Sequence, residues 1–506
     1  MSLLTAPFIN RVLGVYNIGL FSYAQSILNM FLVFSGLGLS MLAAREIAKN
    51  RDNKEKVKII FSSILIASII ASTIVFIPYI LFALFFTPFA NVRTLMLLFV
   101  VSLFLNALNT EWLFTGLEKF GYIAIRSVIL RSLSLIALFV FVRNETDLII
   151  YAIIMIIGLC GLHLLNIIKG VQIAGFSFKS VRPLYFVLLA KIFYLHAIIV
   201  SLYHTFDRLI LGSFSTDELA LYSVARNISL IAITIITVIP LTIAPRAAFL
   251  YSENKDDYKN LVKKSFGFTM YALIPACLGI FILSSSLIAF MGGEQFYRAV
   301  IPLRILALLP LLMCTAMFVN TNIAVPAGKE RNTLISNFAV AGISLSINFA
   351  FARSFGANAA SIAVVTGEIV GLTIMICLAV KQRIFPNIFS INILKFVISG
   401  LIMTGALYFI VPFIDLGDIF NIFVLAIIGV MIYFASNMLL SLVFRRDDEA
   451  MIIIKQFIRK YKRSPVPIAD GVTADEVVIS KIEQHDVATE EIPKEDEDNE
   501  FCEDGD

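Results

Sequence analysis

The chain has 506 residues, of which 59% are hydrophobic and only 15% are charged. Soluble domains carry about 25% charged and roughly 45–50% apolar residues, so this composition excludes a cytosolic enzyme, a secreted disulfide scaffold and a nucleic-acid-binding domain. The formal net charge of +4 conceals a split, because residues 464–506 hold 15 acidic residues and two lysines while the preceding part is basic.

Thirteen long apolar stretches follow one another along the chain. A helix that crosses the hydrocarbon layer needs about 20 largely uncharged residues. Ten stretches contain no Asp, Glu, Lys or Arg: 12–44, 59–91, 94–110, 148–168, 227–245, 265–293, 305–328, 332–352, 396–414 and 419–444. Three more are equally long but carry charges: 121–142, 183–213 and 355–380. Runs of this length predict an all-α integral membrane protein, since the strands of a membrane β-barrel would alternate polar and apolar residues.

The first ten residues, 1–10, are apolar but make only half a span. They lack the basic start and the cleavage site of a signal peptide. We interpret them as the end of a truncated first helix, which brings the expected number of transmembrane helices to about 14. On this interpretation roughly 20 apolar residues belong ahead of Met1, the number that a complete span requires.

The distribution of lysine and arginine predicts the orientation in the membrane. Loops on one side carry 27 of these residues and loops on the other side carry six, one of them Arg208. Cytoplasmic loops are the ones enriched in Lys and Arg. We therefore expect the 45–58 loop and the 445–506 tail, including Cys502, to be cytoplasmic. The acidic, proline-containing part from 464 onward is expected to be disordered.

An internal repeat relates the two halves of the chain. Shifting the sequence by 201 residues places 20–27 on 221–228 and Arg45 on Arg246. Six spans separate the paired segments, so the halves share one orientation and form a parallel repeat. The predicted fold has two six-helix lobes, at 1–170 and 183–383, followed by two further helices at 391–444.

Several segments of the sequence resemble a known family. They are RVLG at 11–14, GLFSYA at 19–24, AREIA at 44–48, NRDNKEK at 50–56, EWLFTGLE at 111–118, DRLILG at 207–212 and GEQF at 293–296. Together they look like the polysaccharide (O-antigen, Wzx-type) flippases of the multidrug/oligosaccharidyl-lipid/polysaccharide exporter superfamily. The half-length first helix departs from that family, whose first helix is complete.

The resemblance implies a transporter and not an enzyme. Such a flippase moves an undecaprenyl-pyrophosphate-linked oligosaccharide across the bacterial inner membrane by alternating access, for the synthesis of surface polysaccharide such as the O-antigen of lipopolysaccharide. The partners it implies are the lipid-linked oligosaccharide, membrane lipids and other polysaccharide assembly proteins. Two alternatives stay open: an ion-coupled multidrug antiporter of the same superfamily, and a membrane glycan polymerase or ligase.

Basic side chains inside the spans are the candidates for holding an anionic head group, because intramembrane charge is costly and is retained for function. These candidates are Arg126, Arg131, Lys191, Arg226 and Arg304. Arginine binds phosphate through two parallel hydrogen bonds. We expect Arg126, which shares a helix face with Tyr122, to contact the pyrophosphate, and Arg131 to be a structural partner within its lobe, pairing with Glu111.

Acidic and polar side chains inside the spans are the candidates for coupling transport to H⁺ or Na⁺. They are His196, Tyr203 and Asp207 on one helix face, together with Glu111 and Glu368. Arg45 and Arg246 are expected to act as gates or as topology determinants. The sequence has no GxxxxGK[ST] motif for ATP, no HExxH pairing and no CxxC spacing, so we expect no cofactor and no metal site.

Overall fold

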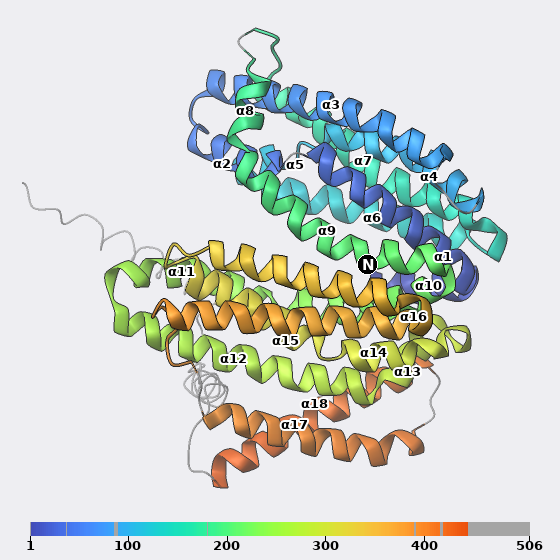
Figure 1. Cartoon of the computed structure of the whole chain (residues 1–506), viewed down its shortest axis with the longest axis vertical. Coiled ribbons are helices and arrows are strands. Elements are labelled where there is room, and N and C mark those ends of the chain that lie inside the picture. Colours follow the sequence, from blue (N-terminus) through green and yellow to red (C-terminus); the bar gives the residue numbers. More distant parts are fainter. Residues whose placement is uncertain are drawn as a thin grey trace, which may run out of the picture. The chain divides into compact units, whose positions relative to one another are not determined.

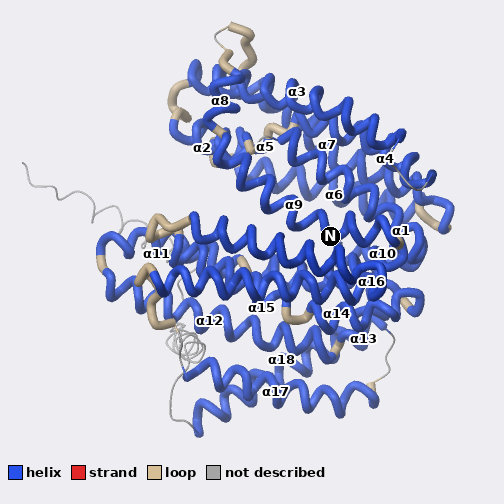
Figure 2. The backbone as a smooth tube through the Cα atoms, in the orientation of Figure 1, coloured by secondary structure: helices blue, strands red, loops and turns tan. Residues whose placement is uncertain are grey.

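The computed structural model describes residues 2–36, 38–85, 90–179, 181–388, 391–414 and 418–443. Within these ranges all regular secondary structure is helical and no strand occurs (Figure 2). The predicted all-α membrane fold is therefore confirmed. The 445–506 tail and the expected disorder from 464 onward lie outside the described residues.

Seven helices form what is here called the N-terminal bundle, in which α1 contacts α3, α4 and α7 (Figure 1). Their bounds are α1 Ser2–Gly36, α2 Leu39–Lys49, α3 Lys54–Phe85, α4 Ala90–Leu105, α5 Glu111–Gly116, α6 Phe120–Phe141 and α7 Leu148–Ala174. Large apolar side chains stay exposed on the outer face of α6, among them Ile125 and Leu133 at 65% and 60%. A lipid-facing surface explains this exposure, because hydrocarbon tails replace a protein partner.

The short helix α8, Pro183–Leu189, leads into a second group, here called the C-terminal bundle. Its helices are α9 Lys191–Phe214, α10 Thr216–Ile236, α11 Val238–Glu253, α12 Lys255–Ile282, α13 Ser284–Gly292, α14 Val300–Leu306, α15 Leu309–Val319 and α16 Arg331–Lys381. The last two helices, α17 Ile391–Ile410 and α18 Asp418–Val443, pack on each other and against α12 and α13 (Figure 1). The exact lobe boundaries expected from the sequence stay predictions.

Two long helices each contain two of the predicted spans. The break inside α1 falls at Gly14 and the break inside α16 at Gly356, where φ is +73° and +55°. Glycine adopts such positive φ values without the steric penalty that a side chain brings. In the described ranges eleven helical segments are long and apolar enough to cross a membrane. With the two breaks and with α9, they account for the 14 predicted spans.

The helix boundaries follow the internal repeat. At the offset of 201 residues, the break at Gly14 corresponds to Ser215, where α9 ends and α10 begins, and the start of α3 corresponds to the start of α12. Both starts are capped by asparagine. Asn53 accepts a hydrogen bond from the Lys56 amide at 3.0 Å, and Asn254 accepts one from the Asp256 amide at 3.0 Å. Such side-chain caps satisfy amides that have no partner inside the helix.

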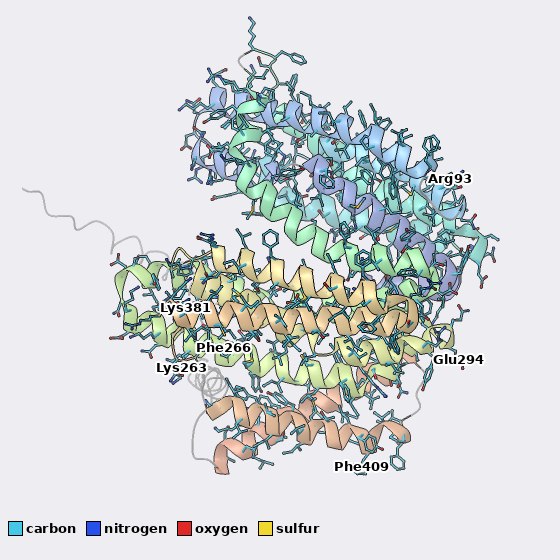
Figure 3. The ribbon with its side chains drawn as sticks, in the orientation of Figure 1. Arg93, Lys263, Phe266, Glu294, Lys381 and Phe409 are labelled. Carbon is cyan, nitrogen blue, oxygen red and sulfur yellow. The ribbon has the colours of Figure 1, made fainter. Side chains whose placement is uncertain are left out.

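The ends of the helices carry the charges on which the orientation was predicted. Figure 3 shows Lys263 and Lys381 at one end of the C-terminal bundle and Glu294 at the other. Arg93, at the start of α4, lies toward the same side as Glu294 (Figure 3). Lys263 and Lys381 thus lie at the same end, the one that the charge distribution predicts to be cytoplasmic.

The two bundles contact each other at the end that carries Glu294, through α1, α10 and α13 (Figure 1). Asn10 donates to the Met291 carbonyl at 2.8 Å, and Arg11 donates to the Ala289 carbonyl at 2.9 Å. A side chain at Gly19 would bring a Cβ within 2.1 Å of the Thr216 carbonyl oxygen. We call this set of contacts the outer contact, because the predicted topology places it on the side away from the cytoplasm.

Candidate functional site: a basic pocket between the bundles

A buried ion pair joins α9 to α10. Asp207 of α9 accepts a hydrogen bond from the Tyr222 hydroxyl at 2.5 Å and pairs with the guanidinium of Arg226 on α10. Arg226 also donates from Nη1 to the Tyr222 oxygen at 2.8 Å. The Asp207 and Arg226 side chains are 1% and 2% exposed. Charges this deeply buried must be paired, so the three side chains form one interdependent cluster.

The position of this cluster follows from helix geometry. Tyr222 and Arg226 are four residues apart on α10 and therefore share a face. The Arg226 guanidinium lies 5.7 Å from the Tyr222 ring centre, within the range of a cation–π contact. The close approach of α10 to α1 at Gly19 holds this part of α10 against the N-terminal bundle.

A pocket of about 320 Å³ lies beside the cluster. It is lined by Ser26 and Asn29 of α1, Thr205 and Arg208 of α9, and Arg226 and Leu230 of α10. Helices of both bundles therefore contribute to it. Among the described lining residues two are arginines and none is acidic.

Arg208 makes this pocket electropositive. Its Nε is buried and has no hydrogen-bond partner among the described residues. The neighbouring carboxylate, Asp207, pairs with Arg226 and accepts the backbone N–H of Arg208 at 2.7 Å. The pocket therefore has two guanidinium groups beside a single carboxylate. That carboxylate already accepts three hydrogen bonds, one of them from Arg226. A pocket of this kind favours an anion with several oxygens, such as a phosphate.

A second polar cluster lies inside the N-terminal bundle. Arg126 of α6 is buried and donates to Glu111 at 2.6 Å, to the Leu162 carbonyl at 3.2 Å and to Asn166. Its guanidinium lies 5.6 Å from the Tyr122 ring centre, which confirms that these two residues share a face.

The pairing with Glu111 was expected for the other arginine of α6. The structure gives it to Arg126 instead and leaves Arg131 exposed on the helix surface. The two positions are five residues apart, a net rotation of about 140° on an α-helix, so they face opposite directions. Which of the two contacts a substrate stays a prediction, but their environments are the reverse of those expected.

The other predicted candidates are spread over the molecule. Lys191 is exposed at the start of α9, and Arg304 of α14 is exposed and donates to Ser284 at 2.9 Å. Glu368 is buried in the second half of α16 and does not line the basic pocket. Neither Lys191 nor Arg304 lines the basic pocket.

Four further candidates concern helix faces and ends. Arg45 of α2 and Arg246 of α11, which the repeat relates, are both exposed, and their role as gates or topology determinants stays a prediction. The side chains of His196 and Tyr203 lie outside the described residues, so their expected stripe with Asp207 is untested. Asp207 itself is buried in the cluster with Arg226.

Sequence reasoning missed Arg208, Ser26, Asn29 and Thr205. Arg208 was counted among the cations of an outer loop, whereas the structure places it inside α9, six residues before the helix ends. The signal that identifies it is its position beside Asp207 in the DRLILG segment. An arginine next to an aspartate in an apolar span is expensive unless both serve a function.

The sequence and the fold match known proteins. Residues 1–249 match the family model described as polysaccharide biosynthesis protein. A putative O-antigen transporter of Escherichia coli K12 is 27% identical over 323 residues, which cover 62% of this chain and 76% of that protein. A putative O-antigen transporter of Shigella dysenteriae is 21% identical over 356 residues, covering 68% of this chain and 86% of that protein.

Two solved structures share the fold. The lipid II flippase MurJ in an inward closed conformation superposes with a TM-score of 0.65 at 15% identity, covering 88% of this chain and 99% of that one. An inward-facing multidrug resistance transporter of the MATE family, in the MOP superfamily, gives 0.59 at 14% identity, covering 76% and 94%. The resemblance drawn from the sequence motifs is thereby confirmed: residues 1–249 match the polysaccharide biosynthesis protein family, and the chain shares its fold with these two membrane transporters.

Proposed function

We propose that this exporter moves an oligosaccharide linked through pyrophosphate to a polyprenyl lipid across the bacterial inner membrane, by alternating access between the two bundles. The observation that carries the proposal is the basic pocket between the bundles. Arg208 supplies there a buried Nε donor that has no hydrogen-bond partner among the described residues, and Arg226 supplies a second guanidinium.

The transport problem is electrostatic. A pyrophosphate and its sugars would have to leave water, and unpaired charge inside a bilayer is costly. Two arginines inside a pocket offer the planar donor pairs that phosphate oxygens accept. Ser26, Asn29 and Thr205 add neutral hydrogen-bonding groups. No bond has to be made or broken, so the residues only need to bind and release the head group.

The proposal also explains why Asp207 lies beside the pocket. An arriving pyrophosphate competes with this carboxylate for Arg226, and a carboxylate that loses its partner in an apolar surrounding takes up a proton or a cation. Asp207 would thus couple head-group binding to H⁺ or Na⁺. Glu111 is a second coupling candidate, because an anion that competes for Arg126 would free its carboxylate.

A multidrug antiporter is the competing function within the same fold. A site for cationic drugs needs a carboxylate that is free to pair with the cargo. The carboxylate beside this pocket, Asp207, is already held by Arg226, Tyr222 and an amide. The balance of charge therefore favours an anionic cargo.

Ligand-dependent thermal unfolding of the purified protein in detergent tests the proposal. A ligand that binds the folded state stabilises it by an amount that rises with the logarithm of the ratio of ligand concentration to Kd. We expect a polyprenyl pyrophosphate to raise the melting temperature, and a polyprenol or a lipophilic cation at equal concentration to do so much less.

Three variants sharpen this test. Arg208→Ala should lose the pyrophosphate effect and Arg208→Lys should retain part of it, because lysine keeps the charge but not the paired donors. Lys259→Ala, which removes an exposed partner of Asp256 on α12, is the matched control and should behave as the parent. Stabilisation by the lipophilic cation but not by the pyrophosphate would support the antiporter instead.

A further inference from the structure

A second pocket, of about 500 Å³, lies close to the basic one and differs from it in chemistry. Its lining is apolar apart from one tyrosine, Tyr194, and comes from α1, α3, α8 and α9. Phe34, Ile70, Ile74 and Leu184 are among its apolar residues. Several of these side chains are exposed, Ile74 and Leu184 by 65% and 69%. The pocket is therefore open to the surroundings of the bundle.

The local sequence creates the hollow. Ala67 and Ala71, four residues apart on α3, present one small-residue face and are both buried. The chain before α8 is fastened to α3, because the Ser177 amide donates to Ser62 at 3.1 Å and the Arg182 amide donates to Ser63 at 3.0 Å. These bonds hold α8 across the alanine face, with a space between.

The two pockets share two helices. On α1, Asn29 lines the basic pocket and Phe34 lines the apolar one; they are about 7.5 Å apart along the axis but point to different sides of the helix. On α9, Thr205 lines the basic pocket and Tyr194 lines the apolar one; they are about 16 Å apart along the axis and share one face of the helix, which runs from one pocket to the other. A molecule with an anionic head and a flexible apolar chain can occupy both at once.

Basic side chains mark the end of the molecule at which the apolar pocket opens. Arg182 and Lys191 flank α8 and are exposed. The predicted topology puts this end on the cytoplasmic side, where a lipid-linked substrate is made available. A chain held here would stay in the cytoplasmic leaflet while its head group reaches the pocket between the bundles.

We propose that the apolar pocket between α3 and α8 binds the proximal part of the polyprenyl chain of the same lipid whose pyrophosphate occupies the basic pocket. This inference rests on the proposed function and assigns the place of the lipid chain. Because α8 leads directly into α9, a chain in this pocket contacts the segment that connects the two bundles. Loading of the lipid is thereby tied to the position of α9.

Photo-crosslinking in lipid nanodiscs tests the placement. The probe is a radiolabelled polyprenyl pyrophosphate, and p-benzoylphenylalanine replaces one residue at a time. We expect strong labelling from Leu184 in the apolar pocket and from Asn29 in the basic pocket. Leu133, 60% exposed on the lipid-facing side of α6, reports background labelling. Leu401, 57% exposed on α17, reports a chain bound along the α17–α18 pair instead.

The outcomes separate the two proposals. Labelling from Asn29 but only background from Leu184 would overturn the chain site and leave the head-group site standing. Labelling from Leu401 above Leu184 would assign the chain to α17 and α18. Background labelling from both Asn29 and Leu184 would contradict the proposed function together with this inference.

A pair of tryptophan variants gives an independent measurement. Ile70→Trp fills the mouth of the pocket, while Ile77→Trp adds the same ring two turns further along the same exposed stripe of α3. Ile70→Trp should weaken binding of polyprenyl pyrophosphate at least about tenfold, because buried methylene groups no longer contribute. Its affinity for inorganic pyrophosphate should not change. Equal effects of the two variants, or an equal loss for inorganic pyrophosphate, would refute the assignment.

Discussion

Replacing Asp207 by asparagine should destabilise the protein strongly. The carboxylate is buried and accepts hydrogen bonds from Tyr222, from Arg226 and from the Arg208 amide. Asparagine keeps the shape and one acceptor oxygen but removes the charge. The Arg226 guanidinium, 2% exposed, then loses the negative charge of Asp207.

The size of the effect follows from that burial. Removing one partner of a buried ion pair costs about 3–5 kcal/mol, because the other charge remains desolvated. Asp256 offers a matched comparison, since it forms an ion pair with Lys259 at 3.0 Å but its side chain is 86% exposed. An exposed pair contributes at most about 1 kcal/mol. The two Asp→Asn variants should therefore differ by several-fold in their loss of unfolding free energy.

Unfolding in mixed micelles with an increasing fraction of SDS measures this difference. Asp207→Asn should unfold at a clearly lower SDS fraction than the parent, and Asp256→Asn close to the parent. The double variant Asp207→Leu with Arg226→Met should recover much of the loss, because apolar residues of similar volume replace buried pairs at little cost. If Asp207→Asn unfolds with the parent, the buried pair does not have the role that its geometry indicates.

Three further predictions concern other parts of the molecule. Arg126→Ala should lower the amount of folded protein in the membrane more than Arg131→Ala does, because the Arg126 guanidinium is buried and hydrogen-bonded. Immunoblotting of membranes compares the two variants, and equal amounts of protein would contradict the prediction. Gly19→Ala should loosen the outer contact, since its Cβ would meet a carbonyl oxygen of α10. Cysteines placed between the bundles should then react faster with a thiol reagent added outside, and an unchanged rate would contradict the prediction. A cysteine at Glu294 should react with an impermeant thiol reagent in intact spheroplasts, and one at Lys381 only after lysis; the reverse would invert the topology.

The fold was largely predictable because its signals are local or periodic. The apolar runs predicted the membrane spans. The repeat at 201 residues predicted that Gly14 corresponds to Ser215 and that the two asparagine-capped helix starts correspond to each other. A break inside a continuous helix, as at Gly356, was also visible as the boundary between two spans. These features depend on the chain's own hydrophobicity and turn residues, and tertiary packing does not alter them.

The site was predictable only in part, because pairing depends on how helices rotate against one another. Asp207 and Arg226 were each identified from the cost of intramembrane charge, yet one was assigned to ion coupling and the other to the head group. Their contact spans 19 residues and the break at Ser215, which no periodicity encodes. The partner of Glu111 depends in the same way on the rotation of α6, and sequence spacing alone did not distinguish Arg126 from Arg131.

A flipping assay in proteoliposomes measures whether the basic pocket carries the head group. A fluorescent oligosaccharide on polyprenyl pyrophosphate is incorporated into both leaflets, and an impermeant reductant added outside quenches only the head groups it can reach. We expect the parent protein and Lys259→Ala to expose the inner pool to quenching, whereas Arg208→Ala should leave it protected and Arg208→Lys should give an intermediate rate. Full exposure of the inner pool by Arg208→Ala, at equal amounts of folded protein, would contradict the claim that the basic pocket between the bundles carries the head group.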